Sequence, residues 1–159
     1  MSDLTIIHHK AMVDHSPHPA NSLEIVRDSL DANATTIEVD IHPLLTDDYL
    51  ITHDVDLESG TTGYGKISDF RIEDAHSLTI KDGNTVTDYK VPLLSDLVAL
   101  IEAHDRPTRL QLDFKHVYPF PTDEPLARLL NIIKPIHSQV IVSSLGDWQL
   151  RQLKRLAPD

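Results

Sequence analysis

The stretch from Thr36 to His42 reads Thr-Ile-Glu-Val-Asp-Ile-His and decides the fold of the chain. Apolar and polar side chains alternate through it, and a period of two is typical of a β-strand, whose successive side chains point to opposite faces. The three apolar residues would therefore share one face and pack against a core. Glu38 and Asp40 would share the other face, so that two carboxylates lie close together late in the strand.

Strand and helix patterns alternate outward from this stretch in both directions. Apolar runs and helical spacings of apolar residues predict strands at 4–8, 49–53, 110–114 and 140–143, and helices at 21–32, 94–101, 123–133 and from 147 onward. Asn21 and Ser22 are both plausible N-caps of the first helix. This order predicts an α/β fold with a mainly parallel sheet, whose binding residues lie at the C-terminal ends of the strands.

The strand expected at residues 49–53 follows the previous one after a turn of about six residues. Such a turn is too short for a helical crossover, so the sequence predicts strand, turn and strand here. Residues 54–90 come next and are rich in Gly, Thr, Asp and Ser. We expect them to form a loop-rich functional insertion within a single domain.

The composition predicts one folded domain over residues 1–159, because 40% hydrophobic content suffices for a single core. The chain contains no cysteine, which excludes disulfide scaffolds, thiolate zinc sites and cysteine nucleophiles. Its apolar runs are far shorter than the roughly 20 residues that span a bilayer, and the N-terminus lacks the layout of a signal peptide. We expect a soluble, cytoplasmic protein.

The charge balance argues against two classes of partner. Asp and Glu number 25 and Lys and Arg 14, giving a net charge of −11. Such a surface repels nucleic-acid backbones and anionic lipid. We expect neither nucleic-acid binding nor stable membrane insertion.

The acidic residues predict a cation site. Asp113 closes the strand at 110–114 and would join Glu38 and Asp40, and three such carboxylates repel one another unless a cation lies among them. Oxygen ligands favour Mg²⁺ or Ca²⁺ over zinc. On spacing alone, a solvated polar strand face is the commoner interpretation of a Glu-x-Asp pair.

Six segments in the right order resemble the glycerophosphodiester phosphodiesterase family, and together they cover nearly all of the chain. Residues 8–10 are similar to the family's His-Arg-Gly strand end, residues 19–22 to its Pro-Glu-Asn-Thr helix start, and residues 38–41 to its Glu-Leu-Asp-Val strand. Residues 53–66 are similar to its His-Asp loop, which ends in Gly-x-Gly-Lys, residues 91–93 to its Ile-Pro-Thr helix entry, and residues 112–115 to its Ile-Glu-Ile-Lys strand. A later Ser-Ser-Phe segment is similar to Ser143, Ser144 and Leu145. The resemblance implies a TIM-type (β/α) barrel.

The resemblance also implies roles for individual residues. His8 and His53 match the family's acid and base. Glu38, Asp40 and Asp113 match its metal ligands for one divalent cation, Mg²⁺ or Ca²⁺. Lys115 matches a family lysine that can hold a phosphoryl oxygen.

Several residues depart from the family pattern. With His8 as the family histidine, His9 and Lys10 replace its Arg and Gly, and would bind the phosphate as point charges without bidentate geometry. Ala20 stands where the family has Glu. Asp113 replaces a Glu, which shortens one metal ligand by a methylene.

The length is the largest departure, because only the first five strands of the barrel are expected and five strands cannot close an eight-stranded barrel. We therefore expect the five N-terminal βα units of an incomplete barrel domain, as in a fragment of a longer chain.

The leading functional interpretation is metal-dependent hydrolysis of glycerophosphodiesters to glycerol phosphate and an alcohol by two-histidine acid/base catalysis. The expected partner is thus a small phosphodiester. Two alternatives stay open at this point. One is a lyase-type phospholipase relative that forms a cyclic phosphate, and the other is a non-catalytic relative that binds phosphate or metal.

Overall fold

The computed structural model describes residues 5–116 and 118–158. Its main element is a sheet in which four parallel strands lie in the order β1 (Ile7–His8), β2 (Thr36–Pro43), β6 (Arg109–Phe114) and β7 (Val140–Ser144). A fifth strand, β3 (Tyr49–Ile51), runs antiparallel to the end of β2. The mainly parallel α/β architecture expected from the sequence is confirmed.

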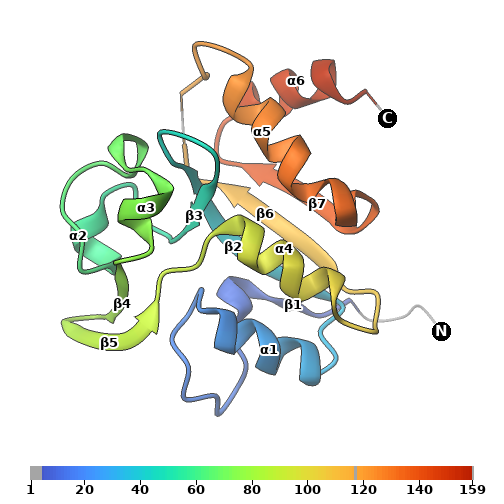
Figure 1. The fold of residues 1–159 in the computed structure, drawn as a ribbon. Helices are drawn as coiled ribbons and strands as arrows, with labels where there is room; N and C mark the ends of the chain where they lie inside the picture. The colour runs from blue at the N-terminus through green and yellow to red at the C-terminus, as the bar shows by residue number, and fades with distance from the viewer. Residues whose placement is uncertain (1–4, 117, 159) are drawn as a thin grey trace.

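A helix follows each parallel strand. These are α1 (Leu23–Asp31), α4 (Leu94–Glu102), α5 (Glu124–Ile133) and α6 (Asp147–Leu156). Figure 1 shows α4 and α5 lying across one face of the sheet. Short 3-10 turns, η1 (His9–Ala11) and η3 (Lys134–Gln139), follow β1 and precede β7.

The core lies between this helical layer and the apolar face of the sheet. The apolar residues of β2 are completely buried, as their alternation predicted, and so are Leu110, Leu112 and Phe114 of β6. Tyr49 on β3 packs edge-on against Phe114, with ring centroids 5.8 Å apart. The helices add leucines and isoleucines from their buried faces. Burial of these side chains fixes which face of each strand is left for polar groups.

The opposite face of the sheet carries the polar residues; Glu38, Asp40 and His42 of β2 are buried there, whereas the outer strands are exposed. Ile7 of β1 and Ile141 of β7 are 53% and 40% exposed on the outermost parallel strands. Among the described residues, no strand pairs with the outer edge of β7. The sheet is therefore an open part of a barrel wall.

Residues 57–90 form a small second layer beside the sheet with a core of its own. It contains α2 (Leu57–Gly60), η2 (Ile67–Asp69), α3 (Ile72–Ala75) and an antiparallel hairpin of β4 (Thr79–Asp82) and β5 (Thr85–Lys90). The sequence indicated only an ordered loop here, and the hairpin is a new finding. Gly63 packs so closely that an added Cβ would lie 2.8 Å from a Leu78 methyl carbon.

The expected five strands are present, but the number of βα units is four. β3 turns back along β2 and leads into the insertion rather than into a barrel helix. The strand expected at 4–8 corresponds to β1, which comprises only Ile7–His8; Thr5 and Ile6 precede it without being part of the strand, and Leu4 lies outside the described residues. Ser22, rather than Asn21, caps α1, because its hydroxyl accepts the backbone N–H of Ile25 at 3.1 Å.

Helix length and composition also bear on membranes. No helix in the described ranges is both long and apolar enough to cross a bilayer.

Leu112 tests whether the layer between sheet and helices carries the stability. Its side chain is completely buried, so Leu112→Ala should lower the free energy of unfolding by about 2–5 kcal/mol. Leu145, which is 71% exposed, is the matched control, and Leu145→Ala should change it by no more than about 0.5 kcal/mol. Urea denaturation measures both. Equal losses in the two variants would contradict this core.

Candidate active site

Three carboxylates meet on the polar face of the sheet. The parallel register of β2 and β6 pairs Asp40 with Asp113, and Glu38 lies two residues earlier on the same face. Oxygen atoms of Glu38, Asp40 and Asp113 all lie within 4.8 Å of one another. The structure thus brings together the three residues that the sequence analysis grouped.

Hydrogen bonds hold each carboxylate in place. The backbone N–H of Lys10 donates to Oε2 of Glu38 at 2.8 Å, and the hydroxyl of Ser143 donates to Oδ1 of Asp113 at 2.9 Å. Oδ2 of Asp40 accepts a hydrogen bond from Nδ2 of Asn21 at 3.2 Å. The cluster is therefore ordered by its neighbours before any ligand arrives.

Charge in this cluster is only partly balanced. Nζ of Lys115 lies 2.9 Å from Oδ1 of Asp40 and 2.5 Å from Oδ2 of Asp113. Burial alone would lower the pKa of Lys115, but the hydrogen bonds and charges of Asp113 and Asp40 raise it above its usual range. One ammonium faces three carboxylates, so the cluster keeps an excess of negative charge.

The pKa of Glu38 is raised in this environment. Its side chain is almost fully buried, and burial raises its pKa, with the charges of Asp40 and Asp113 adding to the effect. The backbone N–H of Lys10 opposes this shift. An oxygen-only donor set with uncompensated charge fits a hard divalent cation such as Mg²⁺ or Ca²⁺.

His8 does not reach this cluster. It pairs with Ile37 in the β1–β2 register and so shares the face that packs on the helices. Its Nδ1 lies 2.6 Å from the hydroxyl of Ser29 in α1. The expected placement of His8 beside the carboxylates therefore needs correction, because its pairing with Ile37 directs its side chain toward the helical layer.

His9 occupies the place expected for His8. Its Nε2 lies 3.8 Å from Oε2 of Glu38, and its side chain is 64% exposed on the polar side of the sheet. The chain turns sharply after it, with φ of 53° at Lys10 and 58° at Ala11, in the left-handed region that favours glycine. This turn directs the Lys10 N–H toward Glu38.

His53 follows β3 at the same end of the sheet. Its Nδ1 lies 3.1 Å from Oδ1 of Asp54, and about half of its side chain is exposed. Nε2 of His42 lies 3.3 Å from the His53 carbonyl oxygen, and burial lowers the pKa of His42, which favours a neutral ring that donates to this carbonyl. The backbone N–H of the preceding residue, Thr52, donates to the Asp40 carbonyl at 3.1 Å and so connects the end of β3 to β2.

Two pockets are lined by residues that contact the carboxylates. One, of about 220 Å³, lies between the sheet end and the insertion, and Lys10, Asn21 and His53 line it together with Lys81 from β4. The other, of about 380 Å³, is lined by His42, Lys115 and His116 and by the apolar side chains of Val55, Ile67 and Tyr118. The expected substrate residues Lys10 and Lys115 therefore line different pockets.

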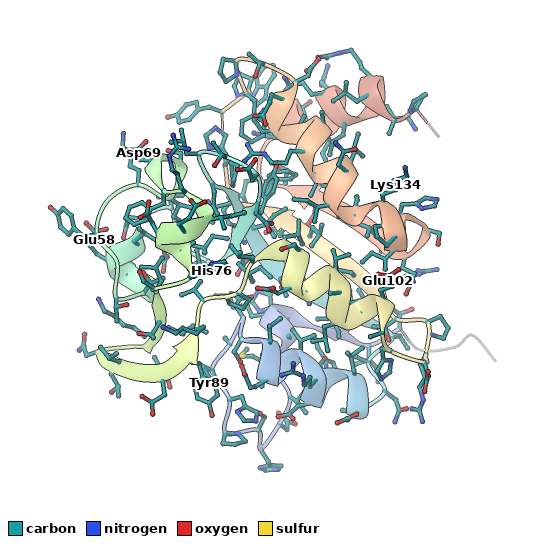
Figure 2. All side chains as sticks on the ribbon, in the orientation of Figure 1. Glu58, Asp69, His76, Tyr89, Glu102 and Lys134 are labelled. Carbon is teal, nitrogen blue, oxygen red and sulfur yellow. The ribbon has the colours of Figure 1, made fainter. Side chains whose placement is uncertain are left out.

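The insertion contacts the loop that connects η1 to α1. In Figure 2 Tyr89 projects from β5 toward that loop, where its hydroxyl lies 2.9 Å from Nδ1 of His18. Glu58 and Asp69, also labelled there, lie on the outer side of the insertion. The insertion thus forms one wall of the site.

Sequence reasoning did not name Asn21 as a site residue, although it considered Asn21 as a helix cap and matched residues 19–22 to the family's Pro-Glu-Asn-Thr segment. The structure buries it beside Asp40, with φ of 61°. The match of Asn21 to the asparagine of the Pro-Glu-Asn-Thr segment was the signal that could have found it.

Comparisons with known proteins agree on one family. Residues 9–159 match the glycerophosphoryl diester phosphodiesterase family. A glycerophosphodiester phosphodiesterase of Caldanaerobacter subterraneus is 26% identical over 162 residues, which cover 99% of this chain and 64% of the relative.

Solved structures share the fold. A glycerophosphodiester phosphodiesterase of Parabacteroides distasonis superposes with a TM-score of 0.79 at 18% identity, over 98% of this chain and 62% of the other. An Oleispira antarctica phosphodiesterase, solved with its product sn-glycerol-3-phosphate, gives a TM-score of 0.75 at 19% identity over 98% and 63%. The chain spans less than two thirds of the length of each of these relatives. Because the family match extends over nearly its whole length, the chain belongs to the glycerophosphoryl diester phosphodiesterase family.

Proposed function

We propose that the protein hydrolyses glycerophosphodiesters to glycerol phosphate and an alcohol with the help of one divalent cation. The observation that carries this proposal is the buried carboxylate cluster, which lies beside His9 and has more negative charge than Lys115 balances. The product named for the Oleispira antarctica relative, sn-glycerol-3-phosphate, supports the same substrate class.

Glu38, Asp40 and Asp113 would hold the cation. A bound Mg²⁺ or Ca²⁺ would stabilise negative charge that develops on a phosphoryl oxygen. Lys115 and Lys10, which line different pockets, would bind the remaining phosphoryl oxygens as point charges. Lys115 contacts Asp40 and Asp113 directly. Once these two carboxylates also bind the cation, the ammonium of Lys115 would shift toward the phosphate.

His9 and His53 are the proposed acid and base. One ring takes a proton from the attacking hydroxyl or water, and the other gives a proton to the leaving alcohol oxygen. Nδ1 of His53 is hydrogen-bonded to Asp54, which leaves Nε2 free to exchange a proton with the substrate. His9 rather than His8 has this role because its ring lies on the polar face next to Glu38.

This assignment shifts the match to the family's His-Arg-Gly by one residue. His9, Lys10 and Ala11 then take the three positions, in agreement with a family match that begins at residue 9. Ala11 replaces the glycine and has the positive φ that a glycine favours. Lys10 replaces the arginine, so a cation remains there without a guanidinium fork.

The reaction is tested by the products formed from glycerophosphocholine with and without EDTA. We expect sn-glycerol 3-phosphate and choline, and no turnover in EDTA. Accumulation of a cyclic glycerol phosphate would instead establish the lyase-type reaction. Absence of any turnover with Mg²⁺ or Ca²⁺ would contradict both reactions.

The variant Glu38→Gln separates stability from cation binding. The pKa of Glu38 is raised in the folded protein, so the native state binds its proton more tightly than the unfolded chain does, and ionised Glu38 lowers stability as pH rises above its usual range. At pH 7 without metal, Glu38→Gln should therefore raise Tm, as thermal unfolding measures, and the increase should vanish at a pH low enough to protonate Glu38 in both states.

The same substitution should weaken divalent-cation affinity by about tenfold or more, as calorimetric titration would measure, because one ligand is lost. Glu102→Gln, at the exposed end of α4 in Figure 2, is the matched control and should leave this affinity unchanged. Unaltered cation affinity in Glu38→Gln would exclude Glu38 as a ligand.

Substitutions of three histidines test the assignment of acid and base. His9→Ala and His53→Ala should each lower kcat by about 10²–10⁴-fold while cation affinity stays nearly constant. His8→Gln should keep kcat within a few fold, since His8 contacts Ser29 on the helical side. A large loss in His8→Gln together with an active His9→Ala would restore the assignment expected from sequence.

A further inference from the structure

A pair of polar side chains connects the insertion to the loop between η1 and α1. Nδ1 of His18 in this loop lies 2.9 Å from the hydroxyl of Tyr89 in β5, and the two rings meet edge-on with their centroids 5.4 Å apart. Among the described residues, no other hydrogen bond connects residues 57–90 with residues 12–22. The contact of His18 with Tyr89 is therefore the polar link between these two segments.

The other side of the His18 ring is anchored to α1. Its Nε2 lies 3.8 Å from Oδ2 of Asp28, and the same oxygen accepts a 2.6 Å hydrogen bond from the hydroxyl of Ser16. That hydroxyl accepts the backbone N–H of His18 at 3.1 Å. Because a carboxylate only accepts hydrogen bonds, Asp28 favours the ring proton on Nε2, and Nδ1 then accepts the proton of the Tyr89 hydroxyl. The link thus runs from the hairpin through the loop to a helix that packs on the sheet.

Both linked segments belong to the surroundings of the pocket of about 220 Å³. Ala20 of the loop and Lys81 of β4 line this pocket together with Lys10. The loop also holds Lys10 directly, because the backbone N–H of Asn21 donates to the Lys10 carbonyl at 3.1 Å. A displacement of the loop or of the hairpin would therefore change both the width of the pocket and the position of Lys10.

We propose that His18 and Tyr89 are positioning residues, whose contact fixes the spacing between the hairpin and the loop and so keeps Lys10 in place for the phosphate. Neither residue is among the described residues that line the pocket, so both act through the segments that they hold. The effect on the substrate rests on the proposed function, because Lys10 has its role only in binding a phosphodiester.

Tyr89→Phe removes the hydroxyl and keeps the ring. Losing a contact that only positions a binding group weakens the binding of substrate and transition state alike, so KM should rise while kcat stays within about twofold. With glycerophosphocholine in saturating Mg²⁺, KM should rise about three- to tenfold, which is the effect of one neutral hydrogen bond. Tyr64→Phe is the matched control, since Tyr64 lies in the same insertion and is 82% exposed, and it should leave both constants unchanged.

Two substitutions of His18 separate the hydrogen bond from the ring. The amide oxygen of His18→Asn can accept the Tyr89 proton near the place of Nδ1, so KM should stay within about twofold of the wild-type value. His18→Ala should raise KM as Tyr89→Phe does. The double variant should be no worse than either single variant, because both remove the same contact. Additive increases in KM would show two separate effects and would overturn the inference.

Amide hydrogen exchange tests the link without any substrate. Backbone amides of β4 and β5 should exchange at least about threefold faster in Tyr89→Phe than in the wild type or Tyr64→Phe, while those of α4 keep their rates. Unchanged exchange in the hairpin, or an unchanged KM in Tyr89→Phe, would overturn the inference alone. A wild-type protein without turnover would overturn the proposed function, and the exchange rates would then decide by themselves whether the contact holds the hairpin.

Discussion

The placement of the carboxyl group of Asp40, fully buried between two other carboxylates, is the constraint on which the site depends. An isolated ion in such a position costs several kcal/mol, and repulsion from Glu38 and Asp113 adds to this cost. Lys115 and the amide of Asn21 offset part of it. Burial of Glu38 itself, and to a smaller extent the charges of Asp40 and Asp113, raise the pKa of Glu38, and a divalent cation would oppose this rise. The electrostatic cost of the cluster and its proposed cation binding thus have one source, an excess of negative charge held in place by the sheet.

The sheet itself determines where this charge lies. Ile37, Val39 and Ile41 are completely buried against the helices, so Glu38 and Asp40 must occupy the other face. A slip of one residue in β2 would bury the carboxylates among leucines, and a slip in the β2–β6 pairing would separate Asp40 from Asp113. The apolar core therefore fixes the register, and the register assembles the cluster. For this reason the cluster could be predicted from alternation in one strand and an acidic residue at the end of another.

Other parts of the site could not be predicted, for physical reasons. Ile6 and Ile7 are both apolar and β1 is only two residues long, so no alternation in the sequence distinguished the direction of His8 from that of His9. Their placement follows from the pairing of His8 with Ile37 and from the positive φ angles after His9. Asn21 lies nineteen residues from Asp40, and their contact arises only when α1 packs on the sheet. The β4–β5 hairpin was hidden because residues 54–90 are polar and carry their small core in scattered positions.

The central claim is that these carboxylates hold a divalent cation, and anomalous diffraction from crystals soaked in Mn²⁺ tests it most directly. The account predicts one strong peak among the oxygens of Glu38, Asp40 and Asp113, at about 2.0–2.4 Å from its ligands, with Nζ of Lys115 moved away from Asp40. A peak only at other carboxylates, or none at these three while Lys115 keeps its contacts, would contradict it.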